Sequence, residues 1–178
     1  MGKRSNEMAR FRQTCCLGVP SEVLVPQIIE ELHRIIPAER MHFAWTDDLG
    51  NIVNSFFEKP DLGALEYLKS NYSQIAEDVG VSFRSTILFG KATGNFRWPY
   101  RAGFEQTESY ARLWRGLNLR YAIDGVLRDS FRPFGQIVLF RSDNEPDFSA
   151  ADEEALAQAL PYITHAVSGP HKTPDAFV

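Results

Sequence analysis

The sequence predicts an α+β fold in which the N- and C-terminal helices lie on one face of an antiparallel sheet, while a helical and loop crossover lies on the other. Three observations predict this fold. Apolar residues recur at helical spacing near both ends of the chain. Two pairs of strand-like segments are each joined by a short turn. A long irregular segment rich in aromatic residues separates the two pairs, and this order of elements is typical of a layered α+β domain.

The first half of the chain contains a helix, a hairpin and a second helical segment. Residues 20–37 carry apolar side chains at helical spacing, so they predict the first helix. Residues 40–58 alternate apolar and other side chains around a turn that contains Gly50, which predicts two antiparallel strands. Residues 62–75 again show helical periodicity and predict the second helix.

The second half begins with the irregular aromatic segment, residues 89–104, and continues with a helix expected at 107–117. Strands are expected at 120–129 and 134–141, and the last helix begins after Ser149. The periodicities place six aliphatic side chains in one core between helices and sheet: Leu32, Ile36, Ile137, Leu139, Leu156 and Leu160.

The last helix has a clear start and a long apolar face. Ser149 is followed three residues later by Asp152, the spacing of a capping box. The apolar face packs on the sheet, or it also contacts a second copy of the chain in a homodimer. For the dimer, we expect Ile163 and Val167 to be the partner-facing residues, because they lie at the far end of the helix.

Three stretches resemble GAF domains, and more narrowly the GAF/PAS-like sensor domains of LuxR-type transcription regulators. They are "LHRIIP" with "RMHFAW", "VLRDSFRPFGQIVLFR", and "PDFSAADEEALAQALPYITHAV". The resemblance implies a ligand-sensing and dimerising module of a bacterial-type regulator, with the DNA-binding part absent from this chain. It divides the chain into an N-terminal arm (1–20), a sensor domain (21–168) and a linker-like tail (169–178).

The aromatic crossover is the candidate ligand site, since GAF domains hold their ligand between the sheet and such a segment. Aromatic rings give a ligand site flat apolar walls with a polar edge, and arginine side chains bind anions. A carboxyl group within an apolar strand is unusual, so it also indicates a site. The alternative is an ordinary core under a long loop. A ligand with an aromatic or anionic part is expected. The candidate ligand-binding residues are Trp45, Arg97, Trp98, Tyr100, Trp114, Tyr121 and Asp124.

The composition and the motifs limit the other function classes. The net charge of -4 argues against direct nucleic-acid binding by this chain, and no apolar run is long enough for a membrane span. No common catalytic motif is present, so the chain is not expected to be an enzyme. A cytoplasmic protein without a metal site is expected, and the sequence identifies no cofactor. The alternative is a stand-alone GAF-fold enzyme or a redox sensor that uses Cys15 and Cys16, although two buried apolar thiols are the simpler interpretation.

Overall fold

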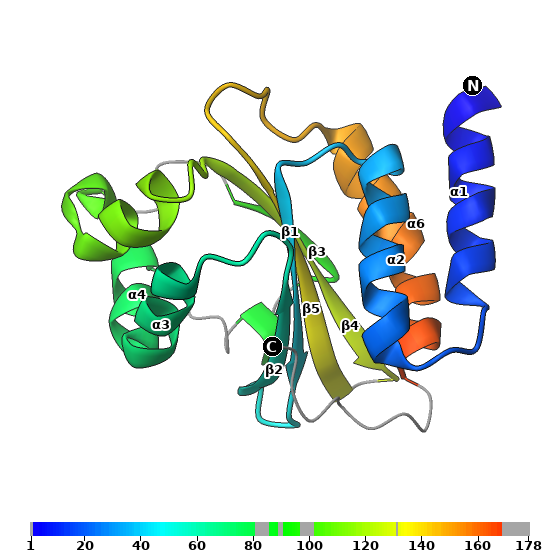
Figure 1. Cartoon of the computed structure of the whole chain (residues 1–178), viewed down its shortest axis with the longest axis horizontal. Helices are drawn as coiled ribbons and strands as arrows, with labels where there is room; N and C mark the ends of the chain where they lie inside the picture. The colour runs from blue at the N-terminus through cyan, green and yellow to red at the C-terminus, as the bar shows by residue number, and fades with distance from the viewer. Residues whose placement is uncertain (1, 81–85, 89–90, 97–101, 131, 169–178) are drawn as a thin grey trace.

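A computed structural model describes residues 2–80, 86–88, 91–96, 102–130 and 132–168. Its centre is a five-stranded antiparallel sheet in the order β2-β1-β5-β4-β3, with helices on both faces (Figure 1). The strands are β1 (Arg40–Thr46), β2 (Ile52–Phe57), β3 (Thr93–Phe96), β4 (Tyr121–Asp129) and β5 (Arg132–Arg141). The helical elements are α1 (Gly2–Cys15), α2 (Ser21–Ile35), α3 (Leu62–Ser70), α4 (Tyr72–Val79), η1 (Phe104–Gln106), η2 (Tyr110–Arg115) and α6 (Ala150–Val167). The α+β fold with a GAF-like arrangement is therefore confirmed.

The face of the sheet that α2 and α6 cover, with α1 packed on the outside of these two helices, holds the hydrophobic core (Figure 1). Alternate residues of β1, such as Met41 and Phe43, point into this core because successive side chains of a strand face opposite sides. All six side chains predicted for the core are buried there: Leu32, Ile36, Ile137, Leu139, Leu156 and Leu160.

The close approach of α6 to the sheet depends on Gly125 in the middle of β4. A Cβ atom built on Gly125 would lie 2.5 Å from a methyl carbon of Leu160. The missing side chain lets α6 pack directly on the backbone of β4, and a glycine inside a strand often marks such an approach.

The stretch expected to be an N-terminal arm, residues 1–20, contains a helix that forms part of the hydrophobic core. Residues 2–15 form α1, which packs on α2 and α6 and adds Met8 and Phe11 to the core. Its basic residues contact other helices of the same chain: Arg10 pairs with Glu31 at 2.8 Å, and the Arg12 guanidinium lies 4.8 Å from the Tyr162 ring centre. The apolar side of α1 was missed because most of its residues are polar.

Two further boundaries also differ from the prediction. The irregular segment contains a strand, β3, which pairs with β4 from Thr93↔Gly125 to Phe96↔Ala122. The helix expected at 62–75 is divided into α3 and α4 at Asn71. Neither change alters the layer order, and β3 extends the sheet beside the strand that carries Asp124.

The expectation that Ile163 and Val167 face a partner chain is wrong. Their exposed fractions are 0% and 5% in the single chain, and both belong to the core under α1 and α2. The helical periodicity was correct, but α1 covers the end of α6 that looked free in the sequence. These two side chains stabilise the protomer itself.

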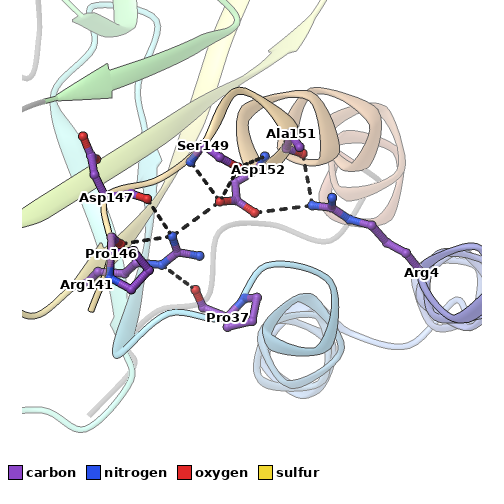
Figure 2. A network of polar contacts seen from close by, with 8 residues as sticks. All are labelled: Arg4, Pro37, Arg141, Pro146, Asp147, Ser149, Ala151 and Asp152. Carbon is purple, nitrogen blue, oxygen red and sulfur yellow. Dashed lines mark hydrogen bonds and ion pairs between the residues drawn. The ribbon is translucent and has the colours of Figure 1, made fainter. Parts of the chain in front are cut away.

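The start of α6 is fixed by a polar network around Asp152 (Figure 2). The predicted capping box is present: the Ser149 hydroxyl accepts from the Asp152 N–H, and the Asp152 carboxylate accepts from the Ser149 N–H. The buried guanidinium of Arg141 donates to Asp152 and to the carbonyl oxygens of Pro37, Pro146 and Asp147. The network thus joins the exits of α2 and β5 to the first turn of α6.

Candidate functional site

A cavity of about 200 Å³ lies on the opposite face of the sheet, under α3, α4 and η2. Most of its wall is apolar. The sheet contributes Ile52, Phe57, Ala122, Val138 and Phe140, and the helical layer with the segment after η2 contributes Ala64, Leu65, Leu68, Tyr72, Ile75, Ala76, Val79, Leu113, Trp114, Leu117 and Leu119. A concave, mainly apolar space with a few polar groups is the usual form of a small-molecule site.

The helical layer over the cavity is held together by a small polar cluster. The Ser109 hydroxyl donates to the Asp78 carboxylate at 2.5 Å, and the Tyr67 hydroxyl lies 3.5 Å from the same Ser109 oxygen. Trp114 packs edge-on against Phe104, with ring centres 4.9 Å apart. These contacts connect α3, α4, η1 and η2 to one another, so the layer forms a cover rather than separate loops.

Charged side chains line the cavity at one end, where β1 begins and β2 ends. Arg40 donates to the Lys59 carbonyl, and Lys59 donates to the carbonyl and carboxylate of Glu39. The Glu58 carboxylate bonds His33 at 2.8 Å and accepts from the backbone N–H of Met41. Asp61 caps α3 by accepting from the Ala64 N–H. Each of these charged side chains is therefore bonded within the chain.

The sheet forms the floor of the cavity and carries buried polar side chains. His42 and Gln136 line it, and the His42 ring stacks on Phe57 with ring centres 4.1 Å apart. Asp124, on β4, lies on the same face of the sheet, and its carboxylate accepts a 2.5 Å hydrogen bond from the Gln136 Nε2. Asp124 and Gln136 are each only 2% exposed.

Burial sets the protonation of these groups. It raises the pKa of Asp124 to about 6, against hydrogen bonds from Gln136 and from the backbone that lower it. It lowers the pKa of His42 to about 3, so this imidazole is neutral at neutral pH. No ion pair with another described residue offsets the burial of Asp124.

The structure brings together only some of the predicted ligand-binding residues. Trp114 lines the cavity, and Asp124 lies on the cavity side of the sheet through its bond to Gln136. Trp45 and Tyr121 do not line it: both point to the opposite face, where they pack with the helix-side core. The prediction failed for these two because it did not establish which face of each strand meets the crossover. Arg97, Trp98 and Tyr100 lie outside the described residues.

His42 and Gln136 were missed as site residues, although the sequence carries a signal for both. Each is a polar residue between apolar neighbours on a strand, which places it opposite the apolar face. His42 follows Met41, and Gln136 precedes Ile137, both core residues on the helix side. Once the helix-side residues are known, alternation assigns His42 and Gln136 to the cavity.

The other candidate chemistry is less well supported. Of the two thiols expected to be buried, only Cys15 belongs to the core, whereas Cys16 is exposed. Burial, followed by the charge of Cys16, raises the pKa of Cys15 to about 12, which favours the protonated thiol. Among the described residues, no cluster of three or more His, Cys, Asp or Glu side chains is arranged to hold a metal ion. No helix in the described part of the chain has the length and apolar character of a membrane span.

The fold is shared with known sensor domains. No family model matches the sequence, and no curated protein matches it. The VqsR LBD domain from Pseudomonas aeruginosa aligns over 93% of this chain and 94% of its own, with a TM-score of 0.58 and 14% identity. The N-acylhomoserine lactone dependent LuxR family transcription factor CepR2 from Burkholderia cenocepacia aligns over 97% and 96%, with a TM-score of 0.62 and 12% identity.

GAF domains are equally similar. The phycocyanobilin-bound GAF domain from a cyanobacterial phytochrome has a TM-score of 0.63 at 11% identity and covers 94% of this chain and 95% of its own. The chain therefore has the GAF-like fold of LuxR-type ligand-binding domains, as its sequence predicted. At these identities the likeness concerns the fold alone.

Proposed function

We propose that this chain is a small-molecule sensing domain that binds its ligand in the cavity between the sheet and the layer of α3, α4 and η2. The observation that carries the proposal is the cavity itself: a mainly apolar space under a helical cover, on a fold shared with ligand-binding domains. Trp114 is the proposed aromatic contact. Arg97, Trp98 and Tyr100 stay predictions as further contacts.

The proposal extends to the role of a transcription regulator. Two of the structural neighbours are the VqsR LBD domain and the LuxR family transcription factor CepR2. We infer that this chain reports its ligand to a DNA-binding part, in the cytoplasm and as a homodimer. Sedimentation of the chain at high concentration tests the dimer, and a monomer under those conditions contradicts it.

A non-enzymatic role fits the chemistry of the cavity better than the alternative of a stand-alone enzyme. Proton transfer needs a titratable group held within hydrogen-bond reach of the substrate. The charged residues at the rim are bonded within the chain, as described above. The floor presents a neutral imidazole and a carboxamide. An imidazole with a pKa of about 3 is a weak base and a carboxamide does not titrate, so these groups bind and orient a molecule more readily than they transform it.

Binding of the neutral fluorophore N-phenyl-1-naphthylamine tests the cavity. We expect saturable 1:1 binding to the wild-type chain, because the fluorophore is apolar and the walls of the cavity are apolar. Leu65→Trp adds bulk to the wall and should weaken binding at least tenfold. Leu49→Trp, the same change at an exposed turn, should leave it unaltered. Non-saturable binding, or equal affinity of the two variants, overturns the proposed site.

A further inference from the structure

The guanidinium of Arg40 lines the cavity and has no counter-charge among the described residues. Arg40 stands at the start of β1, on the same face of the strand as His42, and is half-buried. Its Nη1 donates to the carbonyl oxygen of Lys59 at 3.0 Å. Its Nε is buried and donates to no described residue. Native structures seldom leave a buried donor without a partner, so this end of the cavity favours an incoming acceptor.

The other charged side chains of the described lining are already matched within the chain. Lys59 pairs with Glu39 at 3.2 Å, and its side chain is 56% exposed. Glu58 pairs with His33 at 2.8 Å. Asp61 accepts a backbone N–H in the first turn of α3, where the helix end favours a negative charge. A charge that is partly removed from water and has no counter-charge is unfavourable, so the unmatched guanidinium is the group that attracts an anion.

The unpartnered edge of Arg40 has the shape that a carboxylate fits. Nε and Nη2 lie side by side on one edge of the guanidinium, whereas the bond to Lys59 uses Nη1. Two neighbouring N–H groups of an arginine bond both oxygens of a carboxylate, and such charge-assisted pairs are among the stronger hydrogen bonds of proteins. Phe140 is the register partner of Arg40 on β5 and also lines the cavity. A molecule whose carboxylate bonds Arg40 therefore has an apolar wall directly beside it.

The rest of the cavity determines the size and character of that molecule. Most of the lining side chains are apolar, and the volume is about 200 Å³. A water molecule occupies about 30 Å³ of liquid and a methylene group is of similar size, so the cavity holds a chain of roughly seven carbons. An apolar chain or a small ring of that size fits, with its charged head at the Arg40 end.

We propose that the cavity takes a small monocarboxylic acid with an apolar chain or ring, and that Arg40 binds its carboxylate through Nε and Nη2. The inference rests on the proposed function, since it assumes that the cavity binds a ligand. It adds the chemical class of that ligand, an anion with an apolar body, and the residue that selects it.

Two matched probes test the selection: octanoate, which is charged at neutral pH, and octanamide, which has nearly the same shape but no charge. Isothermal titration gives the affinity ratio of acid to amide for each protein. In Arg40→Met, which keeps an unbranched apolar side chain but removes the charge and the N–H groups, we expect this ratio to fall about tenfold to hundredfold. Arg132→Met, the same change at an arginine side chain that is 80% exposed, should leave the ratio at the wild-type value.

Two further variants separate a specific ion pair from a general effect of charge. Arg40→Lys keeps the charge but removes the paired N–H groups, so it should restore only part of the ratio that Arg40→Met loses. Lys59→Gln removes the other cation of the described lining and should lower the ratio by less than about fivefold, because the Lys59 side chain is mostly exposed. An equal fall in Lys59→Gln and Arg40→Met overturns the assignment to Arg40. Near-UV circular dichroism checks the fold of each variant.

The outcomes separate this inference from the proposed function. If both probes bind but Arg40→Met leaves the ratio unchanged, the selection by Arg40 is wrong and the cavity remains a ligand site. If neither probe binds while N-phenyl-1-naphthylamine does, the class of ligand is again wrong; if the fluorophore also fails to bind, both proposals fail. Should Arg40→Met not fold, the ¹H–¹⁵N spectrum of the wild-type chain decides: octanoate, but not octanamide, should shift the Arg40 Nε–H resonance, and the absence of a shift overturns the ion pair.

Discussion

The two faces of the sheet are built for different tasks. The face under α1, α2 and α6 is covered by side chains that are almost completely buried, with Phe43 and Ile123 among them. The face under α3 and α4 carries the buried polar residues Asp124 and Gln136 and borders a cavity. The first face maximises apolar burial, whereas the second gives up part of that burial and leaves space for another molecule.

The helical covers differ in the same way. α6 contributes six buried residues to the core, whereas α3 has no buried residue and α4 has only Ile75. Elements with few buried apolar contacts open at low free-energy cost. We therefore expect the α3–α4 layer to be the part of the molecule that responds to a ligand.

The strongest test of this comparison is one substitution made on both faces. Leu160→Ala removes a buried side chain between α6 and β4 and should lower the free energy of unfolding by about 2–5 kcal/mol. Leu65→Ala on α3 should lower it by less than about 1.5 kcal/mol, because Leu65 is half-buried beside an existing cavity. Urea denaturation measures both, and equal losses would show that the two faces contribute alike.

A smaller effect is expected from the carboxyl group on the cavity side. The folded-state pKa of Asp124 is about 6, above the ordinary value of 3.8, so the folded chain holds this proton where the unfolded chain has lost it. The stability that Asp124 contributes is present below about pH 4 and is lost as the pH rises through 6. Asp124→Asn should then be more stable than wild type at pH 7.5, by on the order of 1–3 kcal/mol.

The pH dependence of that difference is the decisive measurement. Thermal or urea unfolding between pH 4 and pH 8 should show the advantage of Asp124→Asn growing with pH and levelling off above pH 7. Asn keeps an acceptor for the Gln136 Nε2, so the variant does not leave that donor unpaired. A difference that is constant over this range would mean that Asp124 is not held with a raised pKa.

Much of the fold could be predicted from the sequence because local patterns determine it. Helical periodicity placed Leu156 and Leu160 in the core, and the Ser149–Asp152 spacing predicted the capping box. The contribution of α1 could not be predicted, since Phe11 stands among polar residues and becomes core only through contacts with distant helices. The prediction that Ile163 faces a partner chain was wrong for the same reason, because distant helices bury this side chain.

The site was less predictable than the fold. Strand alternation shows that Trp45 and His42 point to opposite faces, but it does not show which face the crossover covers. The face that the crossover covers depends on long-range packing, and Trp45 and Tyr121 lie on the other face, with the helix-side core. The hydrogen bond between Asp124 and Gln136 joins residues that are separated by a turn and offset in register, so no local sequence motif predicts it.

The smallest effects are expected where the network of Figure 2 reaches the solvent. Ser149→Ala removes the side-chain cap of α6 and should cost about 1 kcal/mol. Arg4→Gln removes an ion pair to Asp152 whose arginine side chain is 44% exposed, and it should cost less than about 0.5 kcal/mol. The same carboxylate keeps Arg141, which is only 8% exposed. Because Phe11 of α1 is completely buried whereas Arg4 is largely exposed, urea denaturation of Arg4→Gln should be nearly that of wild type. A loss as large as that of Ser149→Ala would show that the Arg4 charge helps to hold α1 in place.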